Sequence, residues 1–121
     1  MNAIDTDFIN CTPHTLVLAR ADGVDDLALL PSGEVARVAM RASPRGTVNG
    51  FNVLHDVWGA VEGLPAPRPG CVFLVSGLVL AALEKEGSRR TDVLAPATGP
   101  RDGAVRDAKG FVIAVTQLKG L

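Results

Sequence analysis

The chain has 121 residues, of which 47% are hydrophobic and 21% charged, and its formal net charge at pH 7 is -1. This composition is ordinary for a globular protein and excludes global disorder, and the length suits a single domain over residues 1–121. With 12 basic and 13 acidic side chains, no cationic excess exists to neutralise a nucleic-acid polymer or to attach the chain to a membrane surface. We therefore expect neither as a partner, and a bound anion must be attracted by local charge.

Two features predict a cytoplasmic protein. Residues 1–7 lack the basic segment and apolar core of a signal peptide, and the longest apolar run, residues 71–83, is too short to span a bilayer. The two cysteines, Cys11 and Cys71, both lie in apolar, strand-like runs. We expect them to be buried free thiols, because cytosolic proteins rarely contain disulfides.

The first half of the chain predicts short strands separated by turns. A turn is expected at residues 21–23, and Asn49-Gly50 between apolar residues is a strong hairpin signal. Residues 34–41 alternate between an apolar face and a face that carries Arg37, which is the pattern of a half-exposed strand. The expected strands are residues 8–11, 14–19, 27–30, 34–41, 47–48, 51–55 and 57–61.

The second half contains the one convincing helix. Residues 78–86 are rich in Leu, Ala, Glu and Lys, with Ser76 as N-cap and Gly87 as C-cap. Three prolines make residues 63–70 an extended connector. Gly110 suits the turn of a final hairpin. The expected strands here are residues 71–75, 93–95, 105–106 and 111–118.

These elements together predict an α+β, β-rich domain. Its sheet is expected to be a strongly bent antiparallel or mixed sheet, or a small barrel, with one main helix at about residues 76–86.

The segment from Thr98 to Arg106 is the candidate ligand-binding loop. Its glycines can let the backbone approach a ligand and form an anion-binding nest, and its arginines can clamp a phosphate or carboxylate. Its aspartate can hold a ribose hydroxyl. The alternative is a Pro/Gly surface turn with an Arg–Asp pair. The predicted ligand-binding residues are Thr98, Gly99, Arg101, Asp102, Gly103, Arg106 and His14.

His14 can act as a general base or stack on a ring, and its alternative role is that of a strand-edge histidine fixed by Thr12 or Asn10. The histidines and cysteines do not have the spacing of a metal site, so we expect no metal and no cofactor. Ser76 lacks the first glycine of a nucleophile elbow and is expected to be a helix cap. No catalytic residue is therefore assigned, and Trp58 is assigned to packing rather than to stacking on a base.

The order of several short motifs resembles a group of small phage and prophage proteins that are also found in actinobacterial genomes. The motifs are Asn10-x-Thr-Pro-His14, the segments 30–38, 61–65 and 72–76, and Val105-Arg-Asp-x-x-Gly110. The resemblance covers most of the chain and lends no catalytic residues. It implies a protein that binds a host component or a nucleotide signal rather than an enzyme of central metabolism.

The leading hypothesis is a small binding protein that sequesters a phosphorylated, nucleotide-like anionic ligand, with a homo-oligomer left open. The first alternative is an accessory or inhibitor factor that binds a host protein through strand edges or the proline-rich connector. The second is a small enzyme in which His14 acts with Ser76, Cys11 or Asp102.

Overall fold

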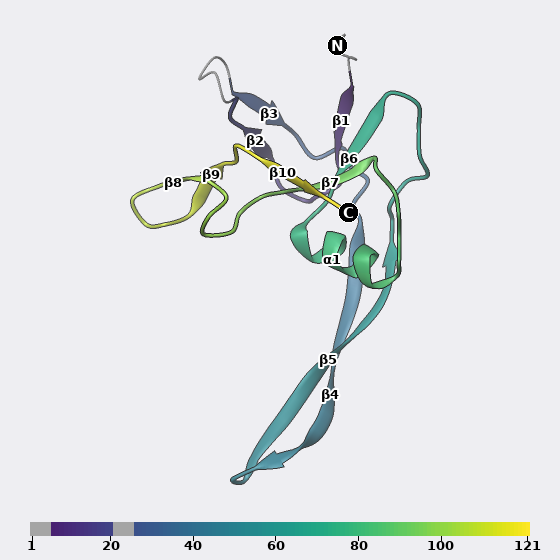
Figure 1. Cartoon of the computed structure of the whole chain (residues 1–121), viewed down its shortest axis with the longest axis vertical. Helices are drawn as coiled ribbons and strands as arrows, with labels where there is room; N and C mark the ends of the chain where they lie inside the picture. The colour runs from purple at the N-terminus through teal and green to yellow at the C-terminus, as the bar shows by residue number, and fades with distance from the viewer. Residues whose placement is uncertain (1–5, 21–25) are drawn as a thin grey trace.

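The computed structural model describes residues 6–20 and 26–121, so the predicted turn at residues 21–23 lies outside the described residues. Figure 1 shows a β-rich body from which one long hairpin projects. The elements in chain order are β1 (Asp7–Asn10), β2 (Leu16–Leu18), β3 (Leu27–Leu29), β4 (Arg37–Val48), β5 (Phe51–Glu62), β6 (Cys71–Leu74), α1 (Gly77–Lys85), β7 (Val93–Pro96), β8 (Val105–Arg106), β9 (Val112–Ala114) and β10 (Leu118–Gly120). The expected α+β, β-rich class with one main helix is confirmed for this part of the chain.

The body is organised around a four-stranded mixed sheet with the strand order β1-β6-β7-β10. β6 pairs in parallel with β1 and β7, and β10 pairs antiparallel to β7 at the sheet edge. The other described strands form three two-stranded sheets, β2-β3, β4-β5 and β8-β9. None of these four sheets closes into a barrel, and a strong bend of the main sheet stays a prediction.

Helix α1 connects β6 to β7 and covers the main sheet. Ser76 is its N-cap, as predicted, and the Ser76 Oγ accepts a hydrogen bond from the Val79 amide at 3.2 Å. Gly87 follows the helix with φ +78°, which only glycine adopts without strain. Val79, Ala82 and Leu83 are buried against the sheet, as their shared face predicts.

The hydrophobic core lies between α1, the main sheet and the first residues of β4. Phe73, Val75 and Val93 have no exposed surface and form its centre together with Cys11. Cys11 and Cys71 are both unpaired thiols, as predicted, but Cys71 is only half-buried. Apolar side chains at the start of β4 and the end of β5 pack against this core from outside.

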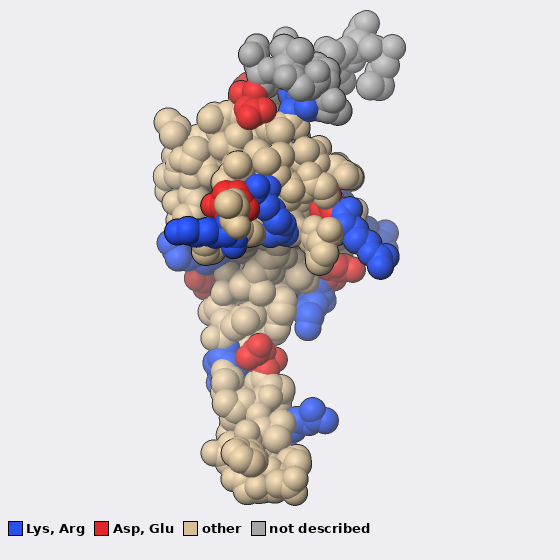
Figure 2. Space-filling model, turned by 90° about the vertical axis from the view of Figure 1, so that its left-hand side faces the viewer, with Lys and Arg blue, Asp and Glu red and all other residues tan. Residues whose placement is uncertain are grey.

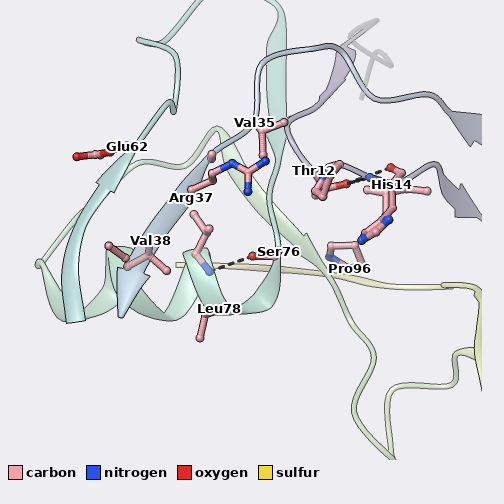
Figure 3. A pocket seen from close by; sticks show the side chains of 14 residues that line it. Thr12, His14, Val35, Arg37, Val38, Glu62, Ser76, Leu78 and Pro96 are labelled. Atoms are coloured by element: carbon pink, nitrogen blue, oxygen red, sulfur yellow. Dashed lines mark hydrogen bonds between the residues drawn. The ribbon is translucent and has the colours of Figure 1, made fainter. Parts of the chain in front are cut away.

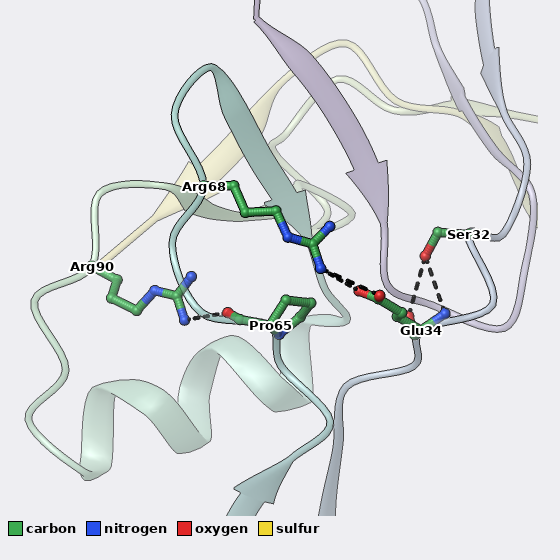
Figure 4. Close-up of polar contacts among 5 residues, drawn as sticks. All are labelled: Ser32, Glu34, Pro65, Arg68 and Arg90. Atoms are coloured by element: carbon green, nitrogen blue, oxygen red, sulfur yellow. Dashed lines mark hydrogen bonds and ion pairs between the residues drawn. The ribbon is translucent and has the colours of Figure 1, made fainter.

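Two arginines lie close to one aromatic residue of the core. The guanidinium groups of Arg68 and Arg90 lie 5.8 and 5.6 Å from the Phe73 ring centre. Figure 4 shows these two arginines with Pro65 and Glu34, to which they donate. Arg90 also donates to both carboxylate oxygens of Asp92, at 2.8 and 2.9 Å, and to the Pro65 carbonyl at 2.8 Å. These bonds fasten the proline-rich connector to the chain that enters β7.

The hairpin of β4 and β5, which we call the arm, leaves the body along the long axis of the molecule (Figure 1). Asn49 and Gly50 form its turn with φ of +49° and +82°, so the predicted hairpin is confirmed. The prediction of separate strands at residues 34–41 and 47–48 was wrong. β4 is instead one strand that runs through Pro44. Proline has no backbone N–H to donate, and a strand that pairs on one side only can tolerate its presence.

The C-terminal segment also differs from its prediction. The hairpin of β8 and β9 forms with Gly110 at φ +85°, as expected. The single strand predicted over residues 111–118 is instead two strands, because the chain leaves β9 after Ala114. It then joins the main sheet as β10, where Leu118 lies opposite Pro96.

No helix within the described residues combines the length and the hydrophobicity that crossing a bilayer requires.

Candidate functional site

A cavity of about 600 Å³ lies where the arm joins the body. Figure 3 shows the side chains that line it. They come from the turn at residues 12–14, from Leu16 in β2, from the start of β4 and the residues before it, from Glu62 at the end of β5, from the N-terminus of α1, and from Pro96 at the end of β7. The volume falls in the range of about 300–1,000 Å³ that is usual for small-molecule sites.

The turn that carries His14 is fixed by a buried asparagine. Asn10 is 2% exposed, and its Nδ2 donates to the carbonyls of His14 at 2.7 Å and Leu29 at 3.0 Å. Its Oδ1 accepts from the amide and the hydroxyl of Thr12, at 3.0 and 2.7 Å. A polar side chain buried with all of its bonds satisfied holds one backbone conformation. Asn10, the last residue of β1, therefore fixes the position of His14 beside the cavity.

The next chain segment is attached to this turn through the backbone. The Ser32 amide donates to the Asn10 carbonyl at 2.9 Å, and the Ala36 amide donates to the Cys11 carbonyl at 3.0 Å. Ala36 is buried, while Arg37 beside it is exposed. Successive side chains of an extended chain point to opposite sides, so Ala36 is buried in the core and the Arg37 guanidinium lies at the cavity.

Arg37 is the cationic group of the cavity. Figure 3 shows its guanidinium directed inward between Val35 and Ser76, whereas Glu62 lies at the outer side of the wall. Arg37 and Glu62 are opposite each other in the pairing of β4 and β5, yet within the described residues neither side chain forms a salt bridge. An unpaired guanidinium has all of its donors free for a planar anion.

The N-terminus of α1 forms another part of the wall. The Ser76 hydroxyl binds the Val79 amide, but the amides of Gly77 and Leu78 belong to the first turn, where a helix offers no internal acceptor. The first turn contains no acidic residue. A helix end of this kind carries a partial positive charge, which adds to that of Arg37.

Most of the remaining wall is apolar. It includes Leu16, Val35, Val38, Leu78 and Pro96. Leu78 is 45% exposed, so the cavity opens to the surface. Apolar walls with a few converging polar groups favour a ligand that combines a flat or apolar body with one charged end.

No residue of the predicted loop lines this cavity. Thr98 lines a second, smaller cavity of about 160 Å³, and Leu16 and Pro96 contribute to the walls of both cavities. Of the seven predicted ligand-binding residues, His14 is the one that lines the larger cavity. The structure therefore does not bring His14 and the loop arginines into one wall.

The polar groups of the loop hold its own conformation. The Arg106 guanidinium donates to the Thr98 carbonyl at 2.8 Å and to the Gly110 carbonyl at 3.0 Å. The Asp102 carboxylate accepts from the Gly99 amide at 2.7 Å and pairs with the Lys119 amine at 3.0 Å. The hydrogen bond from Lys119, followed by that from Gly99, lowers the pKa of Asp102.

Both loop glycines have a structural use as well. A Cβ at Gly99 would lie 2.7 Å from the Asp102 carboxylate, and Gly103 has φ +73°. Its carbonyl accepts from the Thr116 hydroxyl at 3.2 Å. Arg101 is exposed at the tip of the turn. These contacts fit the alternative of a surface turn, and the ligand-binding role of the loop stays a prediction.

The groups considered for an enzyme are occupied in other ways. Ser76 and His14 line the same cavity, but the Ser76 hydroxyl serves as the helix cap. Burial raises the pKa of the Cys11 thiol, which disfavours the nucleophilic thiolate. Asp102 is committed to Lys119 and Gly99 in the loop.

Arg37 is the functional candidate that the sequence interpretation placed on a solvated face. The signal available in the sequence was its position in the segment 30–38, one of the motifs that carry the resemblance. Four of the motif segments contribute to the wall of one cavity although they are far apart in the chain: Asn10–His14, 30–38, 61–65 and 72–76. Only their packing against α1 reveals that they meet.

Comparison with protein-family models, with curated proteins and with solved structures finds no match for this chain.

Proposed function

We propose that the chain is a small binding protein that holds a phosphorylated, nucleotide-like ligand in the cavity at the base of the arm. The observation that carries this proposal is the convergence of an unpaired guanidinium and a helix N-terminus on one apolar cavity of about 600 Å³. Arg37 and the first amides of α1 bind the phosphate, and the apolar wall holds the base or sugar. His14 stacks on the ring or donates to it.

Sequestration rather than turnover is the activity we assign. The cavity contains one histidine and one serine, and the serine is used as a helix cap. Hydrolysis would need a positioned base and an activated nucleophile within hydrogen-bond reach of each other. Tight binding of a free nucleotide lowers its concentration without either group. This role agrees with the resemblance to small phage proteins, which also favours binding over metabolism.

Isothermal titration calorimetry against cyclic and linear nucleotides, with inorganic phosphate and the unphosphorylated nucleosides as references, tests the proposal. We expect one phosphorylated compound to bind and its nucleoside to bind much more weakly. The variant Arg37→Gln should weaken binding by about 10- to 100-fold, because a hydrogen bond to a charged group contributes about 1.5–3 kcal/mol. Absence of binding across the panel would refute the proposal.

Two control variants locate the ligand. Arg89→Gln removes an exposed arginine of the body that does not line the cavity, and should change the affinity less than about twofold. Arg101→Gln should also have little effect. If Arg101→Gln reduces binding and Arg37→Gln does not, the ligand occupies the loop at residues 98–106 and the cavity is not the site.

A further inference from the structure

The arm is supported by the body only near its base. Val38 and Val61 pack against the core, the Val61 amide donates to the Glu86 carboxylate at 3.0 Å, and the Lys85 amine lies 4.6 Å from the centre of the Trp58 ring. The outer part of the arm extends away from the body, and no other element lies beside it (Figure 1). An isolated two-stranded hairpin is marginally stable in water, so an arm of two 12-residue strands calls for a further contact.

The outer part of the arm is apolar and uncharged. Phe51 is 76% exposed, Val48 61% and Leu54 56%. Residues 46–54 contain no charged side chain, and Figure 2 shows the end of the arm without acidic or basic atoms. We call residues 46–54 the tip. Native proteins usually protect exposed strand edges with charges or cover them, and the tip has no such protection.

The exposed area of the chain is larger than its size requires. The chain exposes 8485 Å², whereas a compact monomer of 12.6 kDa exposes about 6,200 Å². The excess is roughly 2,000 Å², and the arm is the described element that departs most clearly from a compact shape. A stable dimer buries about 800 Å² on each partner, so ample area is available for one.

We propose that two copies of the chain pair through antiparallel arms, so that the tip of each arm covers the cavity at the base of the other. β4 and β5 have 12 residues each, which makes the arm about 40 Å long at about 3.3 Å per residue. Two arms of equal length that overlap completely in opposite directions bring each tip to the base of its partner. The cavity lies at that base, between the start of β4 and α1.

The chemistry of the two surfaces matches in this arrangement. The tip offers Phe51 and Val48, and the wall of the cavity offers Val35, Val38 and Leu78, the last of which is 45% exposed. Because the tip is uncharged, it covers the cavity without desolvating a charge of its own. The pairing is isologous, so both copies bury a tip and both cavities are covered.

The apolar surfaces also favour the antiparallel direction. A parallel overlap would leave both tips in contact with each other, and neither tip would reach the apolar wall of a cavity.

Analytical ultracentrifugation of the full chain over a wide concentration range, without nucleotide, tests the pairing. The wild type should sediment as a dimer. Phe51→Asp should weaken dimerisation by about 30-fold or more, as expected for a central aromatic contact. Phe111→Asp is the matched control, because Phe111 is 67% exposed on the body and away from the arm, and it should shift the dissociation constant less than about threefold. A wild type that is monomeric throughout would overturn the proposal, as would equal effects of the two variants.

A photo-crosslinking amino acid at position 51 tests the direction of the arms. Intermolecular crosslinks to residues 35–39 or to Leu78 are expected, and crosslinks confined to residues 48–54 would show tip-to-tip pairing and overturn the proposal.

Since Phe51 is largely exposed, Phe51→Asp should fold, and circular dichroism checks this. Val48→Asp is a second variant for which we expect the same loss of dimerisation. A dimer that binds no nucleotide would refute the proposed function alone, and a monomer that binds one would refute only the pairing.

Discussion

The body and the arm are made of strands with similar pairing, yet they differ in what surrounds those strands. In the body, Phe73 and Val93 are completely buried, and in the described chain every buried side-chain nitrogen or oxygen has a hydrogen-bond partner. In the arm, large apolar side chains such as Phe51 face solvent. Burial thus holds the body together, whereas β4 and β5 pair only with each other among the described strands.

This difference separates two kinds of sequence requirement. Residues of the body are needed for folding, and their substitution should lower stability at any protein concentration. In the proposed dimer, residues of the outer arm contribute to association, and their substitution should have an effect only when copies meet. The cavity lies at the junction, with Asn10 supporting one side and the arm base forming another. Matched substitutions in the two regions therefore test the comparison directly.

The largest contrast is expected for phenylalanine. Phe73→Ala removes a fully buried ring that lies close to two arginines, and it should lower the free energy of unfolding by about 3–5 kcal/mol. Phe51→Ala should change it by less than about 0.5 kcal/mol when the chain is dilute enough to be monomeric. Urea denaturation followed by circular dichroism measures both. Comparable losses for the two variants would mean that the arm is part of the cooperative core.

Asparagine gives the second contrast. Asn10→Ala removes the hydrogen bonds that Asn10 donates to the His14 and Leu29 carbonyls and those that it accepts from the amide and hydroxyl of Thr12. Because each unsatisfied buried group costs about 1–3 kcal/mol before relaxation, the expected loss is about 2–4 kcal/mol. Asn52→Ala, on the exposed arm, should cost less than about 0.5 kcal/mol.

A second measurement connects Asn10 to the site. If Asn10 positions His14, Asn10→Ala should also weaken nucleotide binding at temperatures where the variant is still folded. Calorimetry on the folded variant, compared with Asn52→Ala, measures this effect. Unchanged affinity would limit Asn10 to a purely structural role.

Much of the fold was predictable because turn and cap chemistry is local. Ser76 and Gly87 mark the ends of α1, and Asn49-Gly50 and Gly110 mark two hairpin turns. Each signal depends on the backbone angles of one or two residues, which the residue type largely determines. Such signals need no knowledge of what lies elsewhere in the chain.

The continuity of the arm was not predictable by the same reasoning. Pro44 and the irregular pairing between Pro44 and Gly46 look like a break when only propensities are considered. They are compatible with a strand because β4 pairs on one side only, which is a property of the assembled sheet. The split of residues 111–118 has a similar origin, since β10 is defined by its pairing with β7.

The candidate site was harder still to predict, because tertiary packing determines which residues meet in it. His14 was selected from the sequence, while Arg37 was assigned to a solvated face because a strand pattern cannot show which loops approach it. The loop at residues 98–106 has the composition of an anion site, yet Arg106 and Asp102 bind their own neighbours. A glycine- and arginine-rich composition serves equally well for a self-supporting turn.

The smallest contrast concerns two aspartates and the response to pH. The hydrogen bond from Arg90 lowers the pKa of Asp92, so the ionised carboxylate stabilises the folded chain. That stabilisation is complete above the unfolded pKa of about 3.9 and is lost as the pH falls through the lower folded value. Asp92→Asn should reduce the free energy of unfolding by about 1–2 kcal/mol at pH 7 and make its further loss in acid smaller.

Asp56→Asn, on the exposed arm, is the control and should leave the free energy of unfolding nearly unchanged. Urea denaturation between neutral and acidic pH measures how the free energy of unfolding of each variant depends on pH. If wild type and Asp92→Asn lose the same amount of stability in acid, the Arg90–Asp92 pair does not contribute to the pH dependence.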